Sequence, residues 1–195
     1  MYSAVDICNL ALAYLSVPRI SSLNDEGDVA RSCNQVFDMI RDAVLEEHDW
    51  SFARKELALA EIDESYGGWA YTYAYPDDCI VPRSIIPAAH MANRVNYEIR
   101  ISADSEQNLI LSDQEAASLL YTARIENTVL FAPLFVSGLS VRLAADLALP
   151  LRSDANMAKL LYERYRYVIG FAAESDAGAD YGKATTANLF VEART

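Results

Sequence analysis

The sequence predicts an α+β fold: an antiparallel four-helix bundle, a β-rich lobe inserted between its second and third helices, and an extended C-terminal tail. Three observations lead to this prediction. Apolar residues recur at helical spacing near both ends of the chain, the spacing changes toward two in the middle, and the final segment is small and polar. We therefore expect a helical bundle from 1–50 and 130–173, a β-rich lobe from 51–129, and a flexible tail from 174–195.

Two helices are expected before residue 50. Ser3 and Asp6 resemble a capping box, and the apolar residues after them recur at helical spacing until Val17-Pro18. Asn24 to Asp28 supplies cap oxygens for a second helix, which should end near His48. The apolar stripe of this second helix consists of Val29, Cys33, Val36, Phe37, Ile40 and Val44. Four charged residues lie off the stripe and are expected on a solvated face: Arg31, Asp38, Arg41 and Asp42.

The middle of the chain alternates with the period of a strand. Trp69 to Tyr75 places four aromatic residues on one face of a strand and small residues on the other, so the aromatic face must be buried or bind something. Ala103 to Asn108 is polar and predicts the tip of a hairpin. Pro82 and Pro87 cannot donate ladder hydrogen bonds, which restricts the segment Ile80 to Ala89 to an edge strand or irregular packing.

Two further helices follow the β-rich region. Pro133 suits the first turn of a nearly all-apolar central helix, which Leu149-Pro150 should end. Arg142 and Asp146 are four residues apart on this helix, and the sequence leaves open whether they face the interior, a neighbouring subunit or solvent. Ser153-Asp154 should cap the fourth helix. The apolar stripe of that helix is expected to include Met157, Leu160, Leu161, Arg164, Val168, Phe171 and Ala172, with Tyr162, Tyr165 and Tyr167 around it.

Composition excludes several function classes. The net charge of -12 is spread along the whole chain and disfavours tight non-specific DNA binding. Three widely spaced cysteines without a CxxC motif support neither a disulfide framework nor a zinc site, and fit synthesis in a reducing cytosol. The N-terminus does not resemble a signal peptide, and no apolar run approaches the ~20 residues of a membrane-spanning helix, so we expect a soluble protein.

Catalytic chemistry has no motif in this sequence. The cluster Glu46 to Asp49 radiates around a helix end and is interpreted as solvated surface, not a metal site. The hydroxyls lack a GxSxG context, and neither a GxGxxG nor a GxxxxGK[ST] loop occurs. We predict no catalytic, cofactor-binding or metal-binding residues, and no enzymatic activity. A cleft in which a carboxylate meets a histidine would favour an enzyme instead.

Five segments, taken in order, carry a family resemblance. They are Ile7 to Leu12 with Arg19 to Leu23; Ala30-Arg31 through Arg41 to Leu45; His48 to Ala53; Trp69 to Cys79; and Phe131 to Phe135 with Arg142 to Ala148. On these segments the chain resembles the tail tubular protein A family of short-tailed phages and prophages, the head-to-tail adaptor or connector. Asp49 departs from the proline that is common at its position in that family.

The resemblance implies a structural virion protein. Copies would form a dodecameric ring between the portal protein and the tail nozzle protein, as part of the conduit for genome ejection. DNA would pass through without specific binding, and an acidic wall suits this role because like charge repels phosphate. The resemblance places the protein in the neck of the virion after synthesis in the host cytoplasm, without a membrane.

Two groups of partner-binding residues are expected. The portal-side group is Leu189, Phe190, Val191 and Arg194. The nozzle-side group is Asp104, Ser105, Glu106, Gln107 and Asn108. An alternative from another class is a small helical ligand-binding or regulatory module that uses the aromatic face Trp69 to Tyr75.

Overall fold

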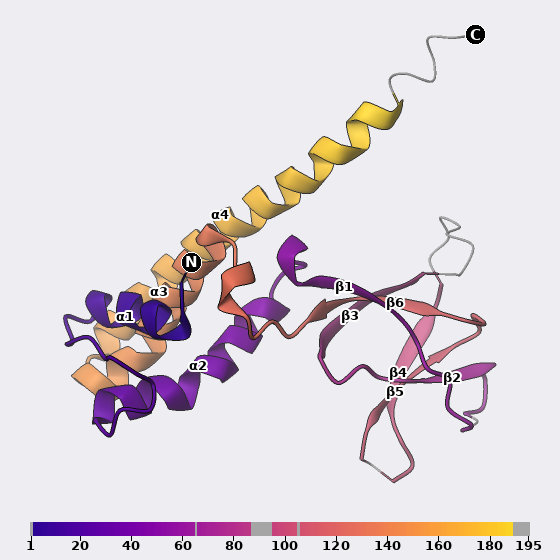
Figure 1. The fold of residues 1–195 in the computed structure, drawn as a ribbon, viewed down its shortest axis with the longest axis horizontal. Helices are drawn as coiled ribbons and strands as arrows, with labels where there is room; N and C mark the ends of the chain where they lie inside the picture. Colours follow the sequence, from indigo (N-terminus) through magenta and orange to yellow (C-terminus); the bar gives the residue numbers. More distant parts are fainter. Residues whose placement is uncertain (1, 65, 87–94, 105, 189–195) are drawn as a thin grey trace. The chain divides into compact units, whose positions relative to one another are not determined.

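The computed structural model describes residues 2–64, 66–86, 95–104 and 106–188, with side chains up to residue 178 (Figure 1). The described residues form four α-helices and two three-stranded antiparallel sheets, so the fold is α+β. The chain divides into two compact units. Met1–Phe52 and Ile125–Thr195 form the helical unit, and Ala53–Arg124 forms the β unit.

The helices begin where local hydrogen bonding favours them. Helix α1 (Ala4–Tyr14) has the predicted capping box, because Ser3 accepts from the Asp6 amide and Asp6 accepts from the Ser3 amide. Helix α2 (Asp28–Glu46) starts after Gly27 without a side-chain cap. The predicted cap residue Asp25 instead accepts hydrogen bonds from Ser21 and Ser22 in the preceding loop.

Helix α3 (Pro133–Arg152) organises the helical unit. It begins at Pro133 as predicted, and it runs two residues past Pro150, which lies in its last turn. By length and composition α3 could cross a membrane, contrary to the expectation from the sequence. However, 61% of its most apolar window is buried inside the protein, as is typical of a core helix.

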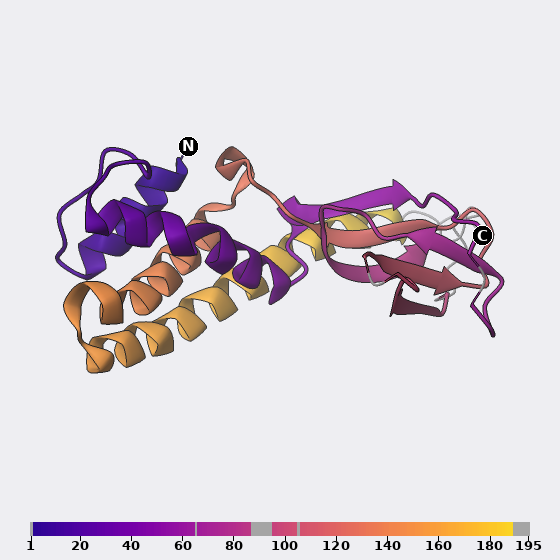
Figure 2. The ribbon, with the colours of Figure 1, turned by 90° about the horizontal axis from the view of Figure 1, so that it is seen from below.

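The predicted four-helix bundle with an extended tail is wrong. Helices α1, α2 and α4 each pack chiefly on α3, and α1 and α2 touch each other only slightly, so the helices gather around one central member (Figure 2). Helix α4 (Ala155–Asn188) includes most of the segment that was predicted to be extended. The small and polar residues of 174–188 continue a helix that Asp154 had already nucleated, because the Met157 amide donates to the Asp154 carboxylate.

The predicted apolar stripe of α4 combines two different faces. Residues on the buried face contact the core: Leu161, Tyr165, Ile169 and Ala172. Leu160 and Phe171 lie elsewhere and are 65% and 57% exposed. Gly138 of α3 meets the buried face, where an added Cβ would lie 2.7 Å from Ile169 Cδ1. Glycine therefore lets α3 and α4 approach closely.

Arg41 of α2 corrects a second prediction. Its side chain is buried, not solvated, and its guanidinium bonds the carboxylates of Asp38 and Asp42 at 2.8 Å each. The other three charged positions off the stripe are at least partly exposed. A charge so close to the apolar stripe is retained in the interior because both carboxylates reach it from the same helix.

The β unit contains both sheets. The first has the order β1 (Arg54–Ala58), β6 (Ser118–Ala123), β3 (Cys79–Ile86), and the second has the order β2 (Tyr71–Ala74), β5 (Asn108–Ser112), β4 (Tyr97–Ile101). The β4–β5 pairing, with Ile101 opposite Asn108, confirms the predicted hairpin. Strand β3 lies at a sheet edge and has an irregular register beside Pro82, as predicted. Pro87 lies outside the described residues.

The predicted aromatic face of β2 is largely internal to the β unit. Tyr71 and Tyr73 stack at 6.3 Å on one face, as the period of two requires. Tyr73 is 1% exposed and donates its hydroxyl to the Gln114 carbonyl at 2.5 Å. Thr72, on the opposite face, is also buried, so β2 is covered on both sides.

Candidate functional site

The residues predicted to bind the portal cannot be placed. Leu189, Phe190, Val191 and Arg194 all lie outside the described residues. The described chain leads to them through the last turns of α4, which continue past the other helices of the helical unit (Figure 1).

The nozzle-side residues lie where strand β4 turns into β5. The Asp104 carboxylate accepts from the Ser102 hydroxyl and the Glu106 amide, and these bonds hold the pKa of Asp104 below its ordinary value. The Ser102 amide donates to the Gln107 carbonyl at 2.8 Å, and Asn108 is already part of β5. Ser105 lies outside the described residues. The tip is therefore an internally bonded turn that presents carboxylates to solvent.

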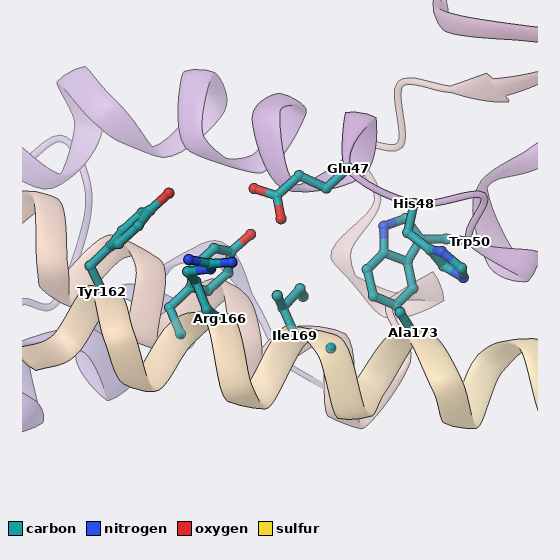
Figure 3. A pocket seen from close by; sticks show the side chains of 9 residues that line it. Glu47, His48, Trp50, Tyr162, Arg166, Ile169 and Ala173 are labelled. Atoms are coloured by element: carbon teal, nitrogen blue, oxygen red, sulfur yellow. The ribbon is translucent and has the colours of Figure 1, made fainter.

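A groove of about 470 Å³ lies between the C-terminal end of α2 and α4 (Figure 3). Its α2 side is lined by Glu47, His48 and Trp50. Its α4 side is lined by Tyr162, Tyr165, Arg166, Ile169, Gly170 and Ala173. Trp50 is fixed because it is 1% exposed and its Nε1 donates to the Val44 carbonyl at 3.0 Å. The indole edge and the α4 side chains therefore form a preorganised wall.

Tyr165 is the buried polar group of this groove. Its side chain is 1% exposed, and its hydroxyl has no hydrogen-bond partner among the described residues. Burial raises the pKa of the Tyr165 phenol, and the nearby Glu47 carboxylate raises it further although it lies outside hydrogen-bonding geometry. The phenol therefore stays protonated and can act only as a neutral donor or acceptor.

Glu47 and His48 line the same groove and are directed differently. Figure 3 shows Glu47 directed toward Arg166, whereas His48 lies against Trp50. The rings of His48 and Trp50 meet edge to face at 5.0 Å. Among the described residues, no three His, Cys, Asp or Glu side chains gather as a metal site. The Glu47 carboxylate and the His48 ring thus face different neighbours within the groove.

Arg142 answers the question left open for the third helix. Its Nε lies 2.9 Å from Asp146, and its guanidinium stands 4.9 Å from the Tyr162 ring and 5.5 Å from the Tyr165 ring. Its side chain is 23% exposed, so the pair is half-buried between α3 and α4. Arg142 consequently joins two helices of one chain.

A second hollow, in the β unit, is acidic. It measures about 460 Å³ and is lined by Glu61, Ile62, Asp63, Glu64, Trp69, Ala70 and Thr72. Trp69 donates its Nε1 to Glu98 at 3.0 Å, so its polar edge is already bonded. Three carboxylates around an indole face would favour a cation over an anion.

Several large apolar side chains are exposed on the surface, and the sequence pattern did not distinguish them from the residues of the core. On α4 they include Leu160, Tyr167 and Phe171, and on β4 they are Ile99 and Ile101. Residues seven and four positions apart share one side of a helix, and residues two positions apart share one side of a strand. The period shows that a face of a helix or strand is apolar, but it does not show which of two apolar faces other elements cover. The sequence therefore did not predict that these side chains are exposed.

No protein-family model matches this chain, and the search of curated proteins finds no relative either.

Proposed function

We propose that this chain is a structural virion protein: a head-to-tail adaptor that forms a homo-oligomeric, dodecameric ring between the portal protein and the tail nozzle protein. The ring would form part of the conduit for genome ejection in the virion neck, after synthesis in the host cytoplasm. The ordered segments that resemble the adaptor family motivate this proposal. Its function is assembly, without catalytic turnover.

The observation that supports the proposal best is the distribution of exposed apolar side chains. Tyr167 and Phe171 on the helical unit are 79% and 57% exposed, and Ile101 on the β unit is 62% exposed. Monomeric soluble proteins seldom leave large apolar side chains grouped on a face without a partner. If each copy in a ring contacts its neighbours through the helical unit and also through the β unit, exposed apolar side chains are expected on both units.

The charge of the chain supports the conduit part of the proposal. A net charge of -12 opposes phosphate binding, and the carboxylates at the hairpin tip are exposed. A polyanion passing such a surface loses the contacts that cause sticking. We propose that the tip residues Asp104 to Asn108 face the nozzle, and that Leu189 to Val191 with Arg194 reach the portal.

The ligand-binding alternative has a specific observation in its favour, the acidic hollow beside Trp69. It is the weaker candidate because Tyr73, the centre of the aromatic face, is buried and bonded within the β unit. The space left at Trp69 is lined by acids, so an occupant would be a cation and not a stacked sugar or base.

The proposal is tested by electron microscopy of the purified chain mixed with the portal protein encoded in the same genome. We expect rings attached to one end of the portal. A chain lacking residues 189–195 is the matched variant and should attach more weakly. Absence of any ring or portal complex with the full chain would contradict the adaptor function.

A further inference from the structure

Helix α4 carries an apolar face directed away from the core of its own unit. Leu160, Tyr167 and Phe171 are 65%, 79% and 57% exposed. With Arg164 between them they follow the spacing four, three, four, which keeps all four residues on one side of a helix. Figure 2 shows α4 along the outer edge of the helical unit, as a helix with a free side.

The same stripe continues into the next turns. Glu174 and Gly178 extend the alternation of three and four residues, which is the a/d spacing of a coiled coil. Glu174 is exposed and has no hydrogen bond or ion pair among the described residues. The guanidinium of Arg164 lies 5.0 Å from the Tyr14 ring of α1. The stripe therefore has one positive position, Arg164, three residues before Tyr167, and one negative position, Glu174, three residues after Phe171.

The order of these residues is self-complementary in one direction. An antiparallel pair of α4 helices centred on residue 169 sets Tyr167 opposite Phe171 and Leu160 opposite Gly178. The same register sets Arg164 opposite Glu174 twice, once on each side of the aromatic centre. A parallel pair would instead oppose Arg164 to Arg164 and Glu174 to Glu174, which like-charge repulsion disfavours. The charges thus select both the partner and its direction.

We propose that the occupant of this face is a second copy of the chain, packed antiparallel through α4 about a two-fold axis. Tyr167 and Phe171 of the two copies form the apolar centre, and the two Arg164–Glu174 pairs fix the register. A two-fold interface is closed and admits two copies only. This pairing goes beyond the adaptor function and does not depend on it; for an adaptor, it is a storage form that must open before a ring assembles.

Charge exchange in the full chain tests the pairing, with sedimentation velocity over a concentration series as the readout. We expect a reversible dimer for the wild-type chain. Arg164→Glu and Glu174→Arg should each raise the dimer dissociation constant by about tenfold, because like charges then oppose each other in the contact. The double variant restores opposite charges in reversed positions, so its dissociation constant should return toward that of the wild type.

A matched control lies on the same helix outside the stripe. Lys159→Glu reverses a charge on an exposed α4 residue, as Arg164→Glu does, and should leave the dimer unchanged. Glu174→Arg also guards against a folding artefact, because Glu174 is exposed and has no hydrogen bond or ion pair among the described residues, whereas Arg164 lies over the Tyr14 ring.

Three results would overturn the proposal. They are a wild-type chain that remains monomeric throughout the series, single variants that behave like the control, and a double variant as weak as the single ones. Since no portal protein is present in this experiment, its outcome is separate from that of the test of the adaptor function.

Discussion

At the scale of single residues, Asn9 holds together the two parts of the first segment that carries the family resemblance, Ile7 to Leu12 and Arg19 to Leu23. Its amide is 7% exposed, donates to the Ile20 carbonyl at 3.0 Å, and accepts from the Ile20 amide at 2.9 Å. These two bonds fasten the loop after α1 to the helix and satisfy backbone groups that burial would otherwise leave unpaired. The Asn9 side chain therefore fixes the backbone at position 20.

Asp78 has a comparable role in the β unit. Its carboxylate accepts from the Tyr121 hydroxyl at 2.8 Å and pairs with Lys55 Nζ at 2.7 Å. Burial acts to raise the pKa of Asp78, but the Lys55 and Tyr121 donors outweigh it, so the pKa lies below its ordinary value. Burial and the Asp78 charge raise the pKa of Tyr121 to about 12, which keeps its hydroxyl a donor.

Asp78→Asn should lower the free energy of unfolding by about 1 kcal/mol at neutral pH, a value reduced for solvent screening of this half-exposed pair. A lowered folded-state pKa contributes stability above the unfolded-state value of about 3.9, and this contribution disappears as the pH falls through the folded pKa. Urea denaturation at a series of pH values measures the difference between the two chains. The exposed neighbour Asp77→Asn is the control and should change little. A difference that does not shrink in acid would contradict the assigned role.

At the scale of elements, the long helix α4 depends on contacts distant in sequence. Asp176 accepts from the Ser51 amide at 2.8 Å and from the Ser51 hydroxyl at 2.6 Å. The neighbours of Ser51 pack on Phe135. The ring centroid of Trp50 lies 5.1 Å from that of Phe135, and the ring centroid of Phe52 lies 4.9 Å from it. Two of the segments that carry the family resemblance thus meet in one aromatic cluster, and Asp176 ties α4 beside it.

Truncations that end on either side of Asp176 should show which part of α4 contributes to the stability of the fold. Deleting residues 179–195 keeps the Ser51–Asp176 bonds and should leave the free energy of unfolding unchanged. Deleting residues 176–195 removes them and should cost about 1 kcal/mol, measured by chemical denaturation.

Ser51→Ala in the shorter chain is the control for this series. This substitution should not lower the free energy of unfolding through the hydrogen bond to Asp176, because the deletion has already removed the Asp176 carboxylate. Equal stability of the two truncated chains would show that the Ser51–Asp176 contact contributes nothing.

The sequence predicted the elements better than it predicted their faces. The capping box of α1, the proline start of α3, the Asp154 cap of α4 and the β4–β5 hairpin each depend on neighbours within a few residues, and each was found. Arg41 and Phe171 were assigned to the wrong surroundings, because burial of one side of a helix depends on which other helix reaches it. The groove at Tyr165 joins α2 to α4 and has no local signal at all.

At the scale of the whole molecule, the two units each have their own apolar core. Leu143 of α3 is fully buried in the helical unit, and Ile110 of β5 is fully buried in the β unit. The β unit is inserted in the chain of the helical unit, so each unit is stabilised mainly by contacts among its own elements.

Core substitutions should therefore act within the unit that contains them. Ile110→Ala should cost about 2–5 kcal/mol and raise amide hydrogen exchange in the β strands, while α3 remains protected. Leu143→Ala should cost a similar amount and show the reverse pattern. The two variants serve as controls for each other, measured by hydrogen exchange with mass spectrometry. Exchange that rises throughout the chain in both would show that the units unfold as one.

The sequence by itself determined where α1, α3 and α4 begin, the edge position of β3, and the acidic character of the chain, since caps, prolines and charges act over a few residues or by simple addition. Only the tertiary structure decided that the helices gather around α3, that 174–188 is helical, that Arg41 is buried, and that Leu160, Tyr167 and Phe171 are left uncovered. The physical reason is that burial belongs to pairs of surfaces. A periodic pattern shows that a face is apolar, and only the arrangement of its neighbours decides whether that face is in the core or free to meet another chain.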